Sequence, residues 1–193
     1  MNLQIPITQM KAEGNWPLSW TSAAGLVQHV ANLGDNITGC ELGVSYGFNL
    51  VYFLENLPNL SKVYAIDPYA PYDDGPSGYV PQDVMDKVKS LFLINTEEYK
   101  DKLEFLNLRS EEAHSHIPDG SLDYIFIDGD HSYDAVIKDL NNYFSKVRSG
   151  GIFAGHDHSW QGVTKALAEF RLANKIKAPL QFCHNDVWYW IKE

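Results

Sequence analysis

The sequence C-E-L-G-V-S-Y-G-F at residues 40–48, followed by Y-A-I-D at residues 64–67, decides the fold. An apolar run that contains Glu41 precedes two glycines four positions apart, and an amphipathic run follows them. This order is typical of a strand, a tight turn and a helix, because glycine adopts turn conformations that other residues avoid and lets a ligand approach the backbone. The N-terminus of the helix offers free N–H groups. The pattern therefore predicts a ligand-binding turn.

Asp67 lies 67 − 41 = 26 residues after Glu41, at the end of a second strand-like run. An acidic side chain at the end of a second parallel strand is where nucleotide-binding folds hold a ribose diol. The spacing E-x-G-x-x-x-G lacks one glycine of the dinucleotide motif G-x-G-x-x-G, and Glu41 would repel a pyrophosphate. A carboxylate there suits an ammonium or sulfonium ligand. The segment resembles the first motif of class I S-adenosylmethionine-dependent methyltransferases.

This resemblance implies a site for S-adenosylmethionine. Glu41 would bind the methionine amine through the glycine loop or through water, and Asp67 would bind the ribose. Ser110 and Glu111 follow the third predicted strand, where they would contact the adenine edge or cap the next helix. The candidate cofactor-binding residues are Glu41, Gly43, Ser45, Tyr46, Gly47, Asp67, Ser110, Glu111 and Asp128.

Length and composition indicate one domain: the chain has 193 residues, of which 45% are hydrophobic. A formal net charge of −10 argues against nucleic acid as a partner, because phosphate binding needs clustered Lys and Arg. Cys40 and Cys183 are interpreted as reduced core residues. The first 14 residues do not resemble a signal peptide, and no segment reaches the ~20 apolar residues of a membrane span. We expect a cytoplasmic protein with a small-molecule substrate and no membrane partner, and leave its oligomeric state open.

Strand-like and helix-like runs alternate along the chain, which predicts a doubly wound, mostly parallel α/β sheet. Residues 1–193 would form one domain, with residues 1–34 as an N-terminal lead-in and helix and residues 35–193 as the α/β core. A stretch rich in Pro, Gly, Tyr and Asp, residues 71–81, predicts a loop. The predicted strands are residues 37–44, 63–66, 103–108, 122–127, 152–154 and 186–191, and the predicted helices are residues 18–33, 48–57, 84–93 or 84–99, 110–116, 136–147 and 163–172.

Acidic and histidine residues follow the fourth and fifth predicted strands, and these strand ends meet at one edge of a parallel sheet. Asp128, Asp157 and His158 could converge on one divalent cation, since oxygen ligands suit Mg²⁺ or Ca²⁺ and an imidazole favours Mn²⁺, Fe²⁺ or Zn²⁺. Alternatively, Asp130 or His131 acts alone as a general base on a hydroxyl group. The competing structural roles are turn formation for Asp128 and helix capping for Asp130.

Two segments extend the resemblance: D-Y-I-F-I-D-G-D-H-S-Y and R-S-G-G-I-F-A-G-H-D, at residues 123–133 and 148–157. Together they resemble the group that contains the methyltransferase 24, catechol O-methyltransferase-like and macrolide-sugar O-methyltransferase enzymes, from about residue 37 to residue 160. The catechol-type pattern implies metal ligands at Asp128, Asp157 and His158 and a base at His131. The sugar-type pattern implies a ligand at Asp128 and a base at Asp130. The chain departs at His158, where Asn or Asp is usual, and at His131, where lysine is usual, which leaves the metal open.

The sequence therefore predicts methylation of a small-molecule hydroxyl by S-adenosylmethionine, with possible help from Mg²⁺, Mn²⁺ or a similar cation. The alternatives are an NAD-linked oxidoreductase, a non-catalytic nucleoside-binding protein of the same fold, and a hydroxylase-like oxidation at the metal cluster. His156 is interpreted as a loop histidine without a ligand role. The aromatic candidates for an acceptor pocket are Tyr46, Tyr69, Tyr72, Tyr79 and Trp160.

Overall fold

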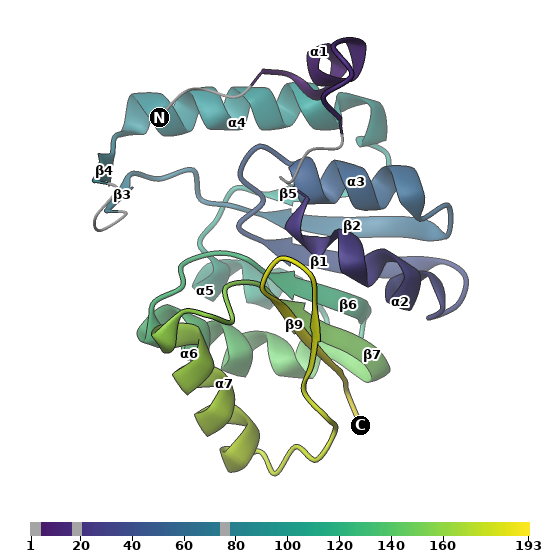
Figure 1. Cartoon of the computed structure of the whole chain (residues 1–193), viewed down its shortest axis with the longest axis vertical. Helices are drawn as coiled ribbons and strands as arrows, with labels where there is room; N and C mark the ends of the chain where they lie inside the picture. Colours follow the sequence, from purple (N-terminus) through teal and green to yellow (C-terminus); the bar gives the residue numbers. More distant parts are fainter. Residues whose placement is uncertain (1–4, 17–20, 74–77) are drawn as a thin grey trace.

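The computed structural model describes residues 5–16, 21–73 and 78–193. In these residues one seven-stranded sheet has the strand order β5-β2-β1-β6-β7-β9-β8 (Figure 1). Its strands are β1 (Ile37–Leu42), β2 (Leu60–Ile66), β5 (Leu103–Leu106), β6 (Leu122–Ile127), β7 (Val147–Gly155), β8 (Gln181–Cys183) and β9 (Val187–Ile191). The first five run parallel to one another, and β9 is antiparallel to both β7 and β8. The prediction of a mostly parallel α/β sheet is confirmed.

The central strands are apolar because helices cover both faces of the sheet. Cys40 pairs with Ile125 and Leu42 with Ile127 in the register of β1 against β6, and all four side chains are buried. Glu41 is the exception within this run, since it is a charged residue with only 5% of its surface exposed. A charge at such a position is costly unless it has a partner, so it marks β1 as the strand to inspect for function.

The helices form two layers, which Figure 1 shows above and below the sheet. One core contains residues of α2, α3 and α4, and the other contains residues of α5, α6 and α7, so each layer covers its own face. The short helix α1 packs on α3 through Met10 and Val51. The helices are α1 (Ile7–Ala12), α2 (Val27–Ala31), α3 (Phe48–Asn56), α4 (Gln82–Thr96), α5 (Ser110–Ala113), α6 (Tyr133–Tyr143) and α7 (Gln161–Ala173).

Some short elements differ from those expected. The predicted helix over residues 18–33 is described only from residue 21 onward, where a 3-10 turn at Ser22–Leu26 precedes α2; residues 18–20 lie outside the described residues. Within the predicted loop over residues 71–81, β3 (Tyr72–Asp73) and β4 (Tyr79–Val80) pair antiparallel, and residues 74–77 are likewise outside. These strands are two residues long, too short for a periodic pattern.

The C-terminal strand β9 lies inside the sheet, between β7 and β8. Trp188 and Trp190 are 1% and 0% exposed, so this strand completes the core beneath α6 and α7. The indole Nε1 of Trp188 donates to the carbonyl oxygen of His156, 2.9 Å away, just after β7. The last strand therefore supports a segment that carries candidate site residues.

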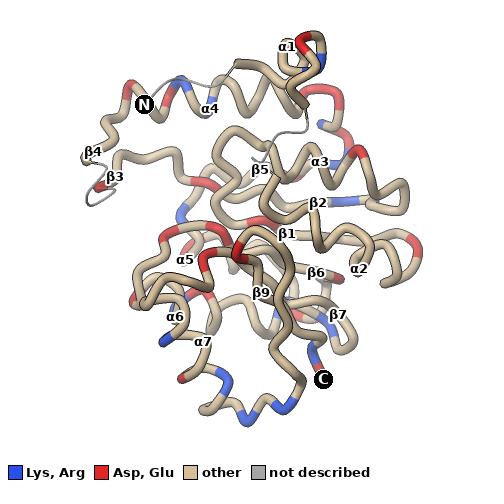
Figure 2. Tube along the Cα trace, viewed as in Figure 1, with Lys and Arg blue, Asp and Glu red and all other residues tan. Residues whose placement is uncertain are grey.

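Charge is distributed unevenly over the fold. Figure 2 shows acidic residues on the loops that follow β6 and β7, and Lys residues on the loop that follows α7. None of the helices in the described part of the chain is long and apolar enough to cross a membrane. The acidic loops indicate which edge of the sheet to examine for a positively charged ligand.

Candidate functional site

The carboxyl ends of the parallel strands border a cavity of about 410 Å³. Ligands of open α/β sheets bind at this edge. The cavity lies between the ends of β1 and β2 on one side and the starts of α5 and α6 on the other. Its lining comprises Leu42, Gly43, Ile66, Pro68, Arg109, Ser110, Glu111, Gly129, Asp130, Ser132, Asp134, Ala135, Lys138 and Asp139.

The turn after β1 passes very close to the loop after β6. Gly43 has φ +81°, and a Cβ built there would lie 2.2 Å from the carbonyl oxygen of Asp128. Its N–H donates to the carbonyl oxygen of Ile66 at 2.8 Å, so the turn is also tied to β2. Only glycine fits both the backbone conformation and the available space. The glycine loop expected from the sequence includes Ser45, Tyr46 and Gly47. Its first residue, Gly43, contacts both the end of β2 and the loop that follows β6.

Glu41 is buried at the end of β1, and burial raises its pKa well above the usual range. The nearby Asp128 and Asp67 raise the pKa further, whereas a hydrogen bond with Asn49 lowers it. The ligand-free site therefore disfavours the ionised form of Glu41. A positively charged ligand would reverse that preference, which is the property expected of a residue that binds an ammonium or sulfonium group.

Asp67 follows β2 and is 7% exposed. One carboxylate oxygen accepts the N–H of Ser45 at 3.0 Å and the other accepts the N–H of Tyr69 at 2.8 Å. The Tyr69 hydroxyl donates to the carbonyl oxygen of Ser45 at 2.6 Å, which closes the link between the two loops. Asp67 thus fixes the shape of the glycine loop, and each oxygen keeps lone pairs for a ligand hydroxyl.

Ser110 and Glu111 begin α5 on the far wall of the cavity. The Tyr143 hydroxyl donates to the carbonyl oxygen of Ser110 at 2.8 Å, and Glu111 lies 3.8 Å from the ammonium of Lys138. Beneath them Asp139 is 4% exposed, and burial raises its pKa to about 6 although a hydrogen bond with Ser110 lowers it. Asp139 was not predicted from the sequence, where the available signal was a carboxylate next to the apolar Leu140 of the predicted helix.

The change Asp139→Asn is expected to remove a pH-dependent loss of stability. Because folding raises the pKa of Asp139, its stabilising contribution is complete below about pH 4 and is lost as the pH rises through about 6. At pH 7 the ligand-free variant should unfold with a free energy about 2–3 kcal/mol above that of the wild type, and at pH 4 the two should agree. Urea unfolding at pH 4 and pH 7 measures the two free energies. An equal difference between variant and wild type at the two pH values would contradict the prediction.

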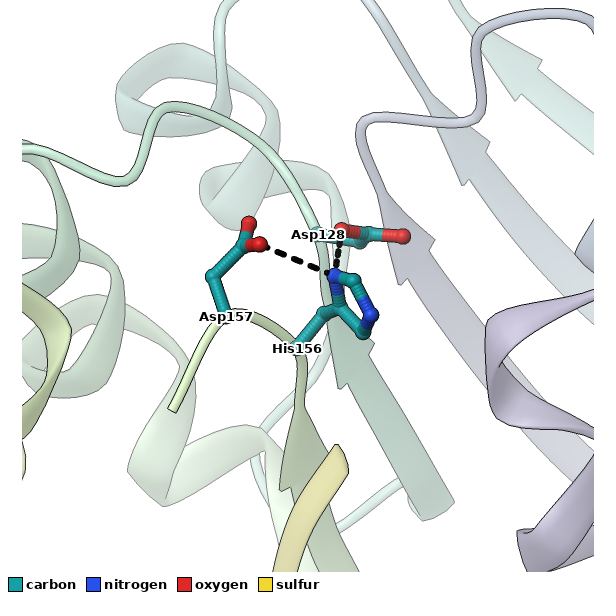
Figure 3. Close-up of side chains that lie close together, drawn as sticks. All are labelled: Asp128, His156 and Asp157. Atoms are coloured by element: carbon teal, nitrogen blue, oxygen red, sulfur yellow. Dashed lines mark ion pairs between the residues drawn. The ribbon is translucent and has the colours of Figure 1, made fainter. Parts of the chain in front are cut away.

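Three side chains form a compact cluster at the ends of β6 and β7 (Figure 3). The imidazole Nδ1 of His156 lies 3.4 Å from Asp128 and 3.1 Å from Asp157. Burial lowers the pKa of His156, but the two carboxylates outweigh this effect and raise the pKa to about 10. One ligand atom from each side chain lies within 4.8 Å of the other two, a spacing that one metal ion could bridge.

His158, expected from the sequence in this cluster, lies outside it. Asp157 has φ +59°, a left-handed conformation that turns the chain away after this residue. The His158 ring packs instead on Phe182, with ring centroids 4.3 Å apart, and its N–H donates to the carbonyl oxygen of Asp186 at 3.2 Å. The structure therefore groups His156, interpreted from the sequence as a plain loop residue, with the two carboxylates.

The two candidate bases flank the cluster. Asp130 lines the large cavity, and its Oδ1 accepts the N–H of Ser132 at 2.7 Å, while Ser132 caps α6. His131 lines a small pocket together with the cluster, and its ring packs on Trp160 with centroids 3.9 Å apart. Asp130 therefore has a turn-forming role, and His131 faces an aromatic side chain that is 49% exposed.

The other aromatic candidates have different surroundings. Tyr69 is 2% exposed and packs on Phe92, so it belongs to the core. Tyr46 stacks on Phe48 with centroids 5.5 Å apart. Tyr72 and Tyr79 lie on the paired segments β3 and β4 and are 43% and 67% exposed.

Asn49, in the first turn of α3, is a site residue that sequence analysis missed. It is 8% exposed, and its Nδ2 donates to the Ser22 hydroxyl at 3.0 Å and lies 3.5 Å from Asp128. Its side chain also bonds Glu41. A polar residue within the apolar run of α3 was the available signal. Asn49 therefore contacts both Glu41 of β1 and Asp128, which follows β6.

Comparisons with known proteins agree with this geometry. A model of methyltransferase domains matches residues 40–158. No curated protein sequence matches the chain. Among solved structures, the O-methyltransferase NovP is 19% identical, with a TM-score of 0.64 over 86% of this chain and 78% of its own. CalS11, a TDP-rhamnose 3'-O-methyltransferase, is 15% identical, with a TM-score of 0.63 over 98% and 88%. A precorrin-6y C5,15-methyltransferase from Geobacter metallireducens is 15% identical, with a TM-score of 0.60 over 87% and 86%. At these identities the likeness shows the fold.

Proposed function

This chain belongs to the family of methyltransferase domains that use S-adenosylmethionine, and on that premise we propose that it methylates a hydroxyl oxygen of a small molecule. The observation that supports this most is the double contact of Asp128. One of its carboxylate oxygens lies 3.5 Å from Asn49 beside the glycine loop, and the other lies 3.4 Å from His156 in the acidic cluster. A donor in the glycine loop and an acceptor at the cluster would therefore be neighbours.

Methyl transfer is an in-line displacement at the sulfonium methyl carbon, so the protein has to align two molecules and remove one proton. We assign the methionine amine to Glu41, the ribose hydroxyls to the free lone pairs of Asp67, and the adenine to the wall formed by Ser110 and Glu111. The C–S bond breaks as the C–O bond forms, and S-adenosylhomocysteine leaves. The buried acids Glu41 and Asp67 are complementary in charge to the donor, which is positively charged before the transfer.

We assign the proton of the acceptor hydroxyl to the imidazole of His131. The carboxylate of Asp130 already accepts a backbone N–H, whereas His131 lies in the same small pocket as the cluster. An imidazole exchanges protons near neutral pH, as a base in this step must. The exposed ring of Trp160 against His131 would support one face of the acceptor.

A divalent cation fits Asp128, His156 and Asp157, since these supply two carboxylates and one imidazole nitrogen within reach of one ion. Such a mixed set suits Mn²⁺, Fe²⁺ or Zn²⁺ better than Ca²⁺, with Mg²⁺ as a further candidate. When bound, the cation would hold the acceptor oxygen and make its proton more acidic. His131 would still be the residue that receives the proton.

The change Asp157→Asn is expected to weaken Mn²⁺ binding by about tenfold or more, because it removes one of the two anionic ligands. Asp130→Asn is the matched control: it removes a carboxylate that lies next to the cluster but outside it, and it should leave Mn²⁺ affinity within about threefold. Titration followed by the electron paramagnetic resonance of free Mn²⁺ measures both. Equal losses in the two variants would indicate general charge attraction in place of coordination.

The first test of the function is calorimetric titration with S-adenosylmethionine, S-adenosylhomocysteine and NAD, with and without Mn²⁺ or Mg²⁺. We expect micromolar binding of the two sulfur nucleosides and none of NAD. Release of S-adenosylhomocysteine in the presence of catechols, other phenols and sugars would then identify the acceptor. Tight cofactor binding with no release of S-adenosylhomocysteine in the presence of any of these acceptors would contradict O-methylation.

A further inference from the structure

Asn95 is a buried side chain for which the proposed reaction has no role. It lies near the end of α4, is 7% exposed, and lines neither the large cavity nor the small pocket beside the cluster. Its amide has two partners that are far apart in the sequence. Oδ1 accepts the N–H of Ile7 at 2.9 Å, and Nδ2 donates to the carbonyl oxygen of Tyr46 at 2.9 Å. Asn95 thus joins α1, which lies beside the end of α4 in Figure 1, to the glycine loop.

On one side, Asn95 completes the short helix α1. Ile7 is the first residue of this six-residue helix, so its N–H has no partner within the helix, and Pro6 before it provides no side-chain cap. A helix of this length is not stable by itself in water and depends on tertiary contacts. The buried side chain of Met10 supplies another of these contacts. The Asn95 amide is therefore one of the few groups that hold α1 in place.

On the other side, Asn95 fixes a peptide group of the glycine loop. The carbonyl oxygen of the Tyr46–Gly47 peptide accepts from Asn95, and the N–H of the same peptide donates to the carbonyl oxygen of Val44 at 2.7 Å. Ser45 and Gly47 on either side have positive φ, +46° and +79°. A left-handed conformation at a residue other than glycine persists only where its surroundings hold it. The two hydrogen bonds therefore keep the loop in this shape.

The amide of Asn95 has two ends of opposite polarity, and α1 decides which end faces the loop. A backbone N–H can only donate, so Ile7 binds the amide oxygen, which leaves the NH₂ group for the carbonyl oxygen of Tyr46. Turning the amide over would place two donors together at Ile7 and two acceptors together at Tyr46. Docked α1 therefore excludes the orientation of Asn95 that would repel the loop.

We propose that Asn95 is a positioning residue that couples the docking of α1 to cofactor binding at the glycine loop. The inference rests on the proposed function, because it takes this loop to hold S-adenosylmethionine. When α1 is docked, the oriented amide stabilises the loop in its binding shape. When α1 is released, Asn95 loses the partner that fixes its orientation, and the loop binds the cofactor less tightly. Coupling of this kind is reciprocal, so a bound cofactor holds α1 more firmly by the same factor.

The test measures the affinity for S-adenosylhomocysteine by calorimetric titration of the wild type and its variants. Asn95→Leu removes both hydrogen bonds, and Met10→Asp places a charge on the buried face of α1 and releases the helix. Each should raise the Kd at least about fivefold. The double variant should bind no more than about twofold worse than the weaker of the two single variants, because both changes break the same link.

The matched control is Asn59→Leu, which removes another amide that joins separate segments. Asn59 precedes β2 and donates to the carbonyl oxygens of Ala31 and Gly34, away from the glycine loop. This variant should keep the wild-type Kd within about twofold. Thermal melting without ligand verifies that each variant is folded.

Hydrogen exchange of residues 7–12 supplies a readout that a purely structural role of Asn95 would not change. In the wild type, S-adenosylhomocysteine should slow the exchange of these amides about fivefold or more, because it stabilises docked α1. In Asn95→Leu the same ligand, at a saturating concentration, should leave their exchange unchanged.

An unchanged Kd in folded Asn95→Leu would overturn this inference while the proposed function stands, and Asn95 would then only cap α1. Losses that multiply in the double variant would also overturn it, because α1 and Asn95 would act on the site independently. The same holds if the ligand does not slow exchange in the wild type. If the wild type binds no sulfur nucleoside, the proposed function fails and the inference fails with it.

Discussion

Replacing Glu41 with glutamine is expected to weaken S-adenosylmethionine binding and, at the same time, to stabilise the ligand-free protein. Removing one member of a buried charge pair costs about 2–5 kcal/mol, so the Kd should rise about 30-fold or more. Folding raises the pKa of Glu41, so the folded protein loses stability as the pH rises from the ordinary glutamate value toward the raised one. The amide does not ionise and avoids that loss. The melting temperature without ligand should therefore increase at pH 7.

The matched control for this change is Glu104→Gln, because Glu104 is a partly exposed strand residue paired with Lys62 outside the site. Its effect on stability should stay within about 0.5 kcal/mol, and cofactor affinity should not change. Calorimetry gives the affinities and differential scanning fluorimetry the melting temperatures. A lower stability of Glu41→Gln than of the wild type at pH 7 would contradict this prediction. It would mean that the ionised carboxylate has favourable partners in the ligand-free fold and that its pKa is not raised by burial.

Gly43→Ala is expected to destabilise the fold by about 3 kcal/mol or more and to abolish cofactor binding. A left-handed conformation alone costs an L-residue about 1–2 kcal/mol. The added Cβ would also meet the backbone of Asp128 at 2.2 Å, and this backbone cannot move aside as a flexible side chain can. The collision would push the glycine loop away from the loop after β6. Urea unfolding and calorimetry would measure the two losses.

Gly120→Ala is the matched control, since Gly120 has φ +67° and open space around an added Cβ. It should lose only the conformational part, about 1–2 kcal/mol, and keep full cofactor affinity. Similar losses in both variants would show that backbone conformation accounts for the whole effect. In that case the close approach of the two loops would have no energetic importance.

The sequence was informative where elements are long and buried on both sides. The runs that became β1, β2 and β6 each end in four consecutive buried residues, and the glycine motif marks where β1 ends. Short elements such as β8, with three residues, carry no period to detect. Strand β7 begins at Val147, five residues before the predicted start. Val147 already pairs with Leu122 of β6, and the polar, glycine-containing segment that follows it interrupts the apolar pattern.

The candidate site was predictable to the level of the strand that carries each residue. Asp67, Asp128 and Asp157 follow β2, β6 and β7, because topology alone brings such positions to one edge. Which of two histidines joins the carboxylates depended on one left-handed residue at Asp157, and no pattern of residue types reveals that conformation. Asn49 and Asp139 were missed for a similar reason: their burial comes from neighbours distant in the sequence.

The position of β9 has a consequence for biosynthesis. A ribosome releases the chain from its N-terminus, so the glycine loop, the acids after β2 and β6, and His156 all emerge before residues 187–191. Yet these last residues form an inner strand of the sheet, and Trp188 supports the backbone of His156. A nascent chain thus exposes its whole set of ligand-binding side chains before the strand that anchors them exists. We expect binding competence to arise only after residues 187–191 have emerged and paired with β7.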